Sequence, residues 1–222
     1  MSYNIAIDGP AGAGKSTIAK LIAKKKGYIY VDTGAMYRAM ALYFLEKGIS
    51  PDDAEKISEA VGDADVTISY ENGEQIVWLN GRNVNGLIRT EEVSQMTSKS
   101  STNGTVRKKL VELQQALAKK ENVVMDGRDI GTCVLPDADV KVYLDASSHV
   151  RAVRRYEELK AKGDACDLAV IEKDIIERDN RDMNREISPL KRADDAHYLD
   201  SSDMTIEQVA DAIIKLCVYC EK

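Results

Sequence analysis

Short apolar runs alternate with longer amphipathic stretches over most of the chain. The short runs, bounded by polar or glycine residues, predict buried strands, whereas the longer stretches have the apolar spacing of helices. The predicted strands are residues 4–8, 28–31, 122–125, 139–144 and 198–200. The predicted helices are residues 16–26, 33–47, 98–120, 149–162, 168–185 and 205–220. Strands that alternate with helices predict an α/β fold, with a parallel sheet covered by helices on both faces.

Residues 64–86 depart from this alternation. Apolar and polar side chains alternate over 66–70, and the Asn72-Gly73 pair is a strong hairpin signal before a second strand at 75–79. A further turn at Asn80-Gly81 then reverses the chain again. The segment therefore predicts a small antiparallel meander inserted into the α/β core.

Bulk properties narrow the class of protein. A chain of 222 residues suits one α/β domain with small appended subdomains. Its formal net charge of −6 disfavours nucleic acid and anionic membranes as partners. No apolar run approaches the roughly 20 residues of a membrane span, and no basic, apolar leader precedes the first strand. We therefore expect a cytoplasmic monomer, with its four cysteines reduced, that contacts neither membrane nor nucleic acid.

Residues 9–16 read Gly-Pro-Ala-Gly-Ala-Gly-Lys-Ser and match a phosphate-binding loop between a predicted strand and a predicted helix. Such a loop turns its backbone N–H groups toward phosphates at the positive end of the helix dipole. We expect Lys15 to reach the β- and γ-phosphates and the Ser16 hydroxyl to coordinate Mg²⁺. The residues expected to hold ATP are Gly9, Pro10, Ala11, Gly12, Ala13, Gly14, Lys15, Ser16 and Thr17.

The arginines indicate a second anion. Seven of the twelve lie in one stretch near the carboxyl end: Arg151, Arg154, Arg155, Arg178, Arg181, Arg185 and Arg192. Arginine binds phosphate bidentately and keeps its charge at any working pH. A solvated helix face is an equally good interpretation of Arg151. No side chain near the loop is a convincing general base, which favours a phosphate monoester over a hydroxyl as acceptor, because the monoester is already ionised.

Four segments resemble the bacterial cytidylate kinase family. They are Asp-Thr-Gly-Ala-Met-Tyr-Arg at 32–38, Asp-Gly-Arg-Asp-Ile-Gly-Thr at 126–132, Leu-Asp-Ala-Ser-Ser at 144–148 and Arg-Asp-Asn-Arg-Asp-Met-Asn-Arg at 178–185. The resemblance implies a P-loop nucleoside monophosphate kinase fold with a five-stranded parallel sheet, a small antiparallel insert and a lid. It implies one kinase domain over 1–222, with a core of 1–35, 96–149 and 167–222, an acceptor-binding subdomain of 36–95 and a lid of 150–166.

The resemblance also implies the reaction and its residues: transfer of the γ-phosphate of ATP to CMP and dCMP, with Mg²⁺. The implied acceptor contacts are Thr33, Arg38, Ser98, Arg107, Arg128, Asp129, Arg178, Asp182 and Arg185. Thr33 stands where relatives often have serine. The expected catalytic side chains are Lys15, Arg128, Arg154 and Arg185, with Arg155 as the next candidate from the lid. Asp129 is the expected reader of the cytosine amino group, because a carboxylate accepts where uracil would present a carbonyl.

Other acceptors stay open on the residues alone. A kinase for UMP or AMP, or for a small non-nucleotide acceptor, would use the same loop. A nucleotide-dependent switch is disfavoured because no guanine-reading Asn-Lys-x-Asp segment is present. Asp182 and Arg185 have the spacing of adjacent helical turns and could simply pair with each other.

Overall fold

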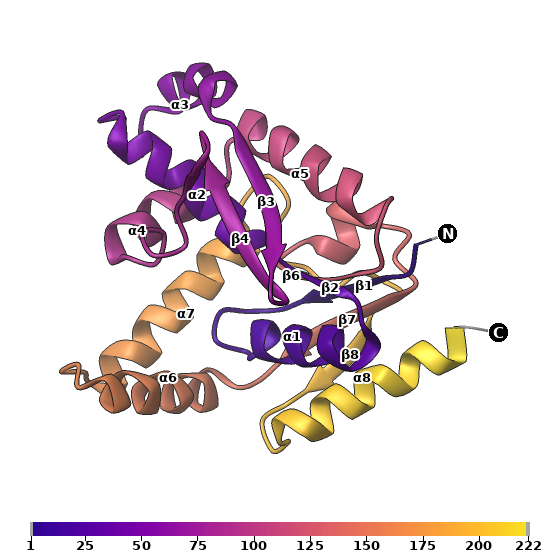
Figure 1. The fold of residues 1–222 in the computed structure, drawn as a ribbon. Coiled ribbons are helices and arrows are strands. Elements are labelled where there is room, and N and C mark those ends of the chain that lie inside the picture. The colour runs from indigo at the N-terminus through magenta and orange to yellow at the C-terminus, as the bar shows by residue number, and fades with distance from the viewer. Residues whose placement is uncertain (1, 221–222) are drawn as a thin grey trace.

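A computed structural model describes residues 2–220 and shows a parallel sheet flanked by helices (Figure 1). The sheet has five strands in the order β2-β6-β1-β7-β8, all parallel, which confirms the predicted sheet. These strands are β1 (Asn4–Asp8), β2 (Ile29–Asp32), β6 (Val123–Gly127), β7 (Val140–Asp145) and β8 (His197–Asp200). The phosphate-binding loop directly follows β1, which is the central strand of the sheet.

Helices cover both faces of the sheet because successive strand residues point to opposite sides. Ala6 packs with α2 and α5, whereas Ile5 and Ile7 pack with α1 and α8. The helices are α1 (Lys15–Lys26), α2 (Thr33–Glu46), α3 (Ala54–Ala60), α4 (Glu91–Ser100), α5 (Gly104–Ala118), α6 (Ser148–Lys162), α7 (Leu168–Asn184) and α8 (Ile206–Cys220). No helix of the described part of the chain is both long and apolar enough to cross a membrane.

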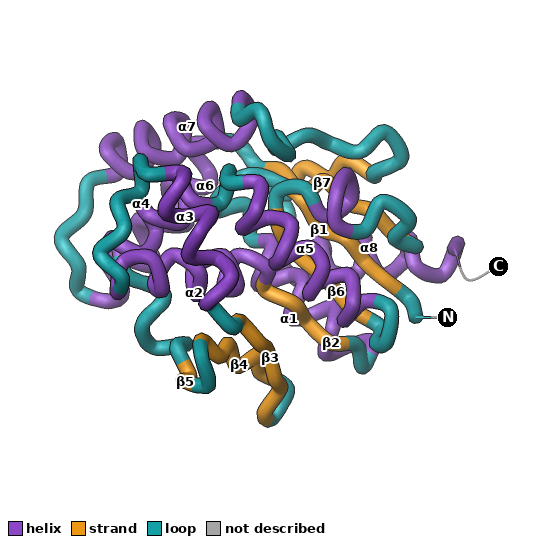
Figure 2. The backbone as a smooth tube through the Cα atoms, turned by 90° about the horizontal axis from the view of Figure 1, so that it is seen from above, coloured by secondary structure: helices purple, strands orange, loops and turns teal. Residues whose placement is uncertain are grey.

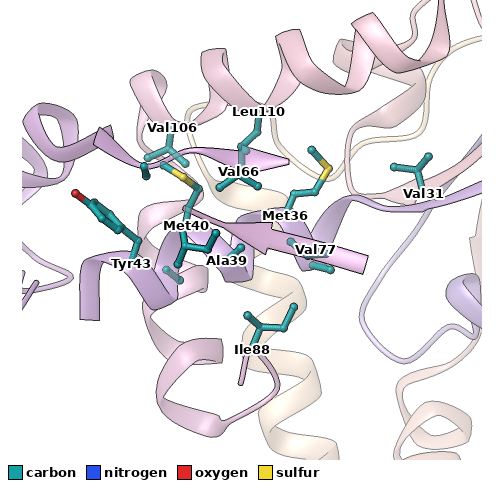
Figure 3. Packing of buried hydrophobic residues seen from close by; sticks show 14 of the residues in the cluster. Val31, Met36, Ala39, Met40, Tyr43, Val66, Val77, Ile88, Val106 and Leu110 are labelled. Atoms are coloured by element: carbon teal, nitrogen blue, oxygen red, sulfur yellow. The ribbon is translucent and has the colours of Figure 1, made fainter. Parts of the chain in front are cut away.

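The predicted meander is confirmed as a separate antiparallel sheet of β3 (Val66–Glu71), β4 (Glu74–Leu79) and β5 (Arg82–Asn83). Figure 2 shows these three strands set apart from the parallel sheet. Their apolar faces pack on α2, where Val66 and Val77 join Met36 and Met40 in one buried cluster (Figure 3). The Gln75 side chain ties the insert to the core, because its amide bonds both the N–H and the carbonyl of Asp32 at the end of β2.

The prediction of one helix over 98–120 is wrong. Two helices, α4 and α5, meet at a break over 101–103, where the Asn103 carboxamide oxygen accepts the N–H groups of Thr105 and Val106. An asparagine that caps a new helix competes with continuation of the old one. The short helix α3, capped by Asp53, was not predicted.

Helices α6 and α7 run beside each other as a hairpin at one side of the sheet (Figure 1). Ser147 caps the start of α6, Gly163 ends it in the left-handed conformation with φ of 83°, and Asp167 caps α7. A left-handed C-cap is accessible to glycine at little cost, so this turn is encoded locally. The hairpin brings the arginines of both helices toward the carboxyl edge of the sheet.

Candidate active site

Each strand of the parallel sheet carries an aspartate at or next to its carboxyl end: Asp8, Asp32, Asp126, Asp145 and Asp200. The register pairs Asp32 with Asp126, and Asp145 with Asp200, so these carboxylates share one edge of the sheet. Ligands of open α/β sheets bind beyond this edge. The phosphate-binding loop starts there, at the end of β1.

The loop has the backbone that its glycines predict. Gly9 has φ of 148°, and a Cβ there would lie 1.9 Å from the Leu144 carbonyl oxygen, so no larger residue fits. Gly14 is left-handed at the start of α1. The buried Lys15 ammonium donates to the Pro10 carbonyl at 2.6 Å, across the loop. Burial, and then the nearby Arg128 guanidinium, lower the pKa of Lys15 to about 7, so an anion in the loop would favour its protonated form.

Arg151 is a structural residue of this loop. Its buried guanidinium donates to the carbonyls of Ala11 (2.8 Å) and Ala146 (2.8 Å) and pairs with Asp179 at 2.7 Å. The interpretation of Arg151 as part of a solvated helix face is therefore wrong. The side chain links the loop to α6 and α7, and it is occupied by protein partners.

A hydroxyl and a carboxylate that could bind a divalent cation lie together at the start of α1. The Ser16 hydroxyl donates to one carboxylate oxygen of Asp126 at 2.9 Å, and the Tyr30 hydroxyl donates to the other at 2.9 Å. Burial, and then the charge of Asp32, raise the pKa of Asp126. A hydroxyl and one carboxylate fit Mg²⁺, which usually takes one or two carboxylates and completes its shell with water and substrate phosphates. Asp126 was not among the predicted metal residues, although its position at a strand end is a usable signal.

Asp8 supports the segment that follows β6. Its two carboxylate oxygens accept the N–H groups of Ile130 and Gly131, each at 2.7 Å. Burial raises the pKa of Asp8 to about 6, although these two N–H groups act in the opposite direction. The preceding residues, Arg128 and Asp129, are thereby held at the edge of the sheet. Asp8 was also absent from the predicted site.

A cavity of about 1400 Å³ opens between the loop, α4, α6, α7 and the start of α8. Its lining includes residues 11–18, Ser94, Ser98, Arg154, Arg155, Arg178, Arg181, Ser201, Met204 and Val209. Ser98 lies here on α4, and Arg89 before α4 also lines the cavity. Arg89 and Arg181 were not predicted as acceptor contacts, although Arg181 belongs to the arginine-rich stretch. Two of the predicted acceptor contacts, Ser98 and Arg178, thus line the same cavity as the phosphate-binding loop.

Arg107, Asp129 and Arg185 form one buried cluster. The Arg107 guanidinium pairs with one oxygen of Asp129, and Arg185 Nη2 lies 3.7 Å from the other. The side chains of Arg107 and Asp129 are each 7 % exposed. Burial lowers the pKa of Arg185, and Arg107 acts in the same direction while Asp129 opposes it. Asp129, the predicted reader of the base, therefore lies beside two other predicted acceptor contacts, Arg107 and Arg185.

A second cluster joins Arg128, Asp182 and Arg178. Arg128 Nε donates to the Asp182 carboxylate at 2.8 Å. Burial alone would raise the pKa of Asp182, but Arg128 and Arg178 outweigh it and lower that pKa. Burial, and then Arg128, lower the pKa of Arg178. The pairing of Asp182 with Arg185 on one helix does not occur, because each side chain has a different partner.

Arg38 lies at the start of α2 and pairs with Asp32 at 3.1 Å, while the more exposed Arg89 reaches the same carboxylate at 3.3 Å. Thr33 is buried, and its hydroxyl donates to the Asp126 carbonyl at 2.7 Å. On α6, Arg154 donates to the Ser201 carbonyl at 2.8 Å, and Arg155 pairs with Glu158 on the surface. Both arginines thus have protein partners, and Arg154 is the one that contacts the core.

The geometry defines the class of protein. The phosphate-binding loop opens onto the same cavity as the arginines of α7, and carboxylates hold further arginines beside it. The fold and the site are therefore those of a P-loop phosphotransferase whose acceptor is an anion.

Comparisons with known proteins identify the family. The profile of the cytidylate kinase family matches residues 5–218. The chain is 51 % identical over 213 residues to a cytidylate kinase of Caldicellulosiruptor saccharolyticus, covering 96 % of this chain and 94 % of that protein. It is 46 % identical over 212 residues to the cytidylate kinase of Bacillus subtilis, covering 96 % and 95 %. The chain belongs to the cytidylate kinase family and is an ATP-dependent kinase that phosphorylates CMP.

A solved structure of an uncharacterized protein from Eubacterium ventriosum is similar in fold. The two superimpose with a TM-score of 0.53 over 99 % of each chain, at 13 % sequence identity. At this identity the likeness concerns the arrangement of the sheet and its helices alone.

Proposed function

We propose that CMP and dCMP bind with the phosphate among Arg38, Arg128 and Arg185. The observation that carries this proposal is an excess of cations: five arginines (Arg38, Arg107, Arg128, Arg178 and Arg185) meet three carboxylates (Asp32, Asp129 and Asp182) beside the phosphate-binding loop. Burial and repulsion between arginines lower the pKa of Arg178 and of Arg185, and a phosphate dianion would favour their charged forms. Each carboxylate beside a clamp arginine also faces a second arginine, so a bound phosphate would add an anion where cations are in excess.

Asp129 reads the cytosine amino group in this proposal. Its carboxylate is fixed between Arg107 and Arg185, and the N–H groups bound by Asp8 fix the backbone just after it. A carboxylate held in this way accepts from an amino group and repels a carbonyl, which discriminates cytosine from uracil. Arg107 holds that carboxylate in place, and Ser98 approaches the nucleotide from α4.

Arg178 and Asp182 bind the sugar. The Asp182 carboxylate lies 2.8 Å from Nε of Arg128 and orients that clamp arginine. A sugar hydroxyl bound to Asp182 would therefore share this carboxylate with Arg128. Thr33 contributes mainly by holding the carbonyl of Asp126, since its hydroxyl is buried against it. Sugar and phosphate recognition are therefore coupled through one ion pair.

Phosphoryl transfer rests on position and charge. Lys15 turns from the Pro10 carbonyl to the β- and γ-phosphates of ATP. Ser16 and Asp126 would hold Mg²⁺, which would supply positive charge to neutralise the charge that develops during transfer. Arg128 and Arg185 hold the attacking phosphate oxygen in line, and the acceptor needs no general base because it is already ionised. Arg154, with Arg155 as alternative, leaves its partner when the lid of 150–166 closes and excludes water.

We place the reaction in the cytoplasm and in a single domain with the subdomain boundaries 36–95 and 150–166. Cys133 and Cys166 are free thiols, which suits a reducing compartment. We propose that the enzyme acts as a monomer.

The base-reading role is tested with Asp129→Asn, which preserves the shape of the side chain and removes its charge. We expect kcat/KM for CMP to fall by about tenfold or more, with a smaller fall for UMP, because a buried hydrogen-bonded group commonly discriminates by 1–3 kcal/mol. Arg82→Ala is the control, since Arg82 pairs with Glu46 on the exposed side of the insert. Equal losses with CMP and UMP would show that Asp129 does not read the base.

A further inference from the structure

Ser188 has an unusual backbone conformation. Among the described residues, three that are not glycine have positive φ: Asn72 (53°), Asn80 (48°) and Ser188 (51°). Asn72 and Asn80 precede glycines in the turns of the insert, where asparagine tolerates this conformation. Ser188 has no such explanation, and it precedes Pro189, a neighbour that favours extended backbone in the residue before it. Strain of this kind persists where the surroundings hold it, and it often accompanies function.

The carbonyl of Ser188 contacts one arm of the proposed phosphate clamp. It accepts a hydrogen bond from Arg185 Nε at 2.5 Å. The same guanidinium lies 3.7 Å from Asp129 through Nη2, a buried atom that makes no hydrogen bond in the described structure. One edge of the guanidinium is thus fixed by backbone, and the other is left with a donor directed toward the acceptor side.

The surrounding segment holds Ser188 in place. The Leu190 N–H donates to the Asp182 carbonyl at 2.8 Å, and the Leu190 side chain is buried. Further along, Asp195 accepts from the buried Lys141 ammonium of β7 at 2.7 Å. The hydrogen bond between Leu190 and Asp182 closes the segment 182–190 around Ser188, so the turn at Ser188 is restrained by it.

We propose that Ser188 is a positioning residue for the acceptor phosphate: its left-handed backbone presents a carbonyl that orients the Arg185 guanidinium toward the substrate. The inference rests on the proposed role of Arg185 in the clamp. It assigns the function to the backbone of Ser188, and the hydroxyl group is dispensable. What matters at this position is therefore tolerance of positive φ, which glycine and asparagine have and β-branched residues lack.

The test compares Ser188→Val with Ser188→Gly and Ser188→Asn. In the valine variant we expect KM for CMP to rise about tenfold, equivalent to about 1.4 kcal/mol, while KM for ATP stays unchanged. The glycine and asparagine variants should keep the wild-type KM for CMP, although each loses the hydroxyl. A rise in both Michaelis constants alike, or an equal loss in all three variants, would overturn the proposal.

Two further variants separate the possible failures. Asn80→Val imposes the same kind of backbone strain in a turn of the antiparallel insert, close to the ion pair of Arg82 with Glu46 of α2. It should lower the stability of the protein without changing KM for CMP. Arg185→Ala tests the clamp itself. If it leaves KM for CMP unchanged, the proposed function of Arg185 fails. If it raises that KM while Ser188→Val does not, the positioning role of Ser188 alone is refuted.

Discussion

The buried ion pair of Arg107 and Asp129 should make a large contribution to the free energy of unfolding. Both side chains are only 7 % exposed, so removing one partner leaves a charge in a poorly solvated place. Breaking such a pair commonly costs about 3–5 kcal/mol, a large share of the roughly 5–15 kcal/mol that stabilises a domain. Replacing both partners by apolar residues is often close to neutral.

The position of Arg185 makes the two single variants unequal. In Arg107→Met, Asp129 still has Arg185 at 3.7 Å, whereas Asp129→Leu leaves two guanidinium groups without that carboxylate. We therefore expect Asp129→Leu to lose about 3–5 kcal/mol and Arg107→Met to lose less. The double variant should be more stable than Asp129→Leu alone, because only Arg185 then lacks its partner.

Urea unfolding followed by circular dichroism measures these free energies, provided that the slope with denaturant is the same in all four proteins. The double-mutant cycle then isolates the interaction of the pair. Additive losses, or a larger loss in Arg107→Met than in Asp129→Leu, would refute the reasoning from burial and charge.

Three other predictions concern the phosphate-binding loop. Lys15→Ala should reduce kcat by at least about 100-fold, the usual effect of removing one group that stabilises transition-state charge, and single-turnover ADP formation measures the loss. Binding of ATP at pH 8 should take up a proton, because Lys15, with a pKa of about 7, is mostly neutral at that pH and the bound phosphates favour its charged form. The apparent affinity for ATP should therefore fall as the pH rises above 7. Titration calorimetry in buffers of different ionisation enthalpy detects the proton uptake. Arg151→Met should lower the free energy of unfolding, measured by urea denaturation, by about 3–5 kcal/mol, because it leaves Asp179 buried without its partner. A loss below about 1 kcal/mol, the size expected for an exposed ion pair, would contradict this prediction.

Local patterns in the sequence were enough to predict the sheet, the phosphate-binding loop and the insert. Period-two alternation and the Asn72-Gly73 turn act over a few residues, so the chain encodes them where they occur. The break between α4 and α5 was missed although no apolar residue lies between Met96 and Val106. The run Ser-Ser-Thr-Asn-Gly at 100–104 is a loop signal, and Asn103 is a good helix cap, so the break is marked in the sequence.

The site was predictable where residue type dictates chemistry, and less so where distant backbone decides it. Lys15 and Ser16 follow from the motif. Arg151 depends on the carbonyl oxygens of Ala11 and Ala146, for which no sequence pattern exists, so its structural role emerged only from the fold. Asp126 is a candidate from the sequence, because it ends a predicted strand at the edge where ligands bind, but its place beside Ser16 at the metal site required the fold.

The central claim, that the anion accepted beside the phosphate-binding loop is a cytidine monophosphate, is tested most directly by ADP production from ATP and Mg²⁺. CMP, dCMP, UMP, AMP and GMP are offered separately, with a reaction lacking any monophosphate as control. We predict strong turnover with CMP and dCMP and little with the others or with none. ATP hydrolysis at the same rate with every acceptor, and without one, would contradict it.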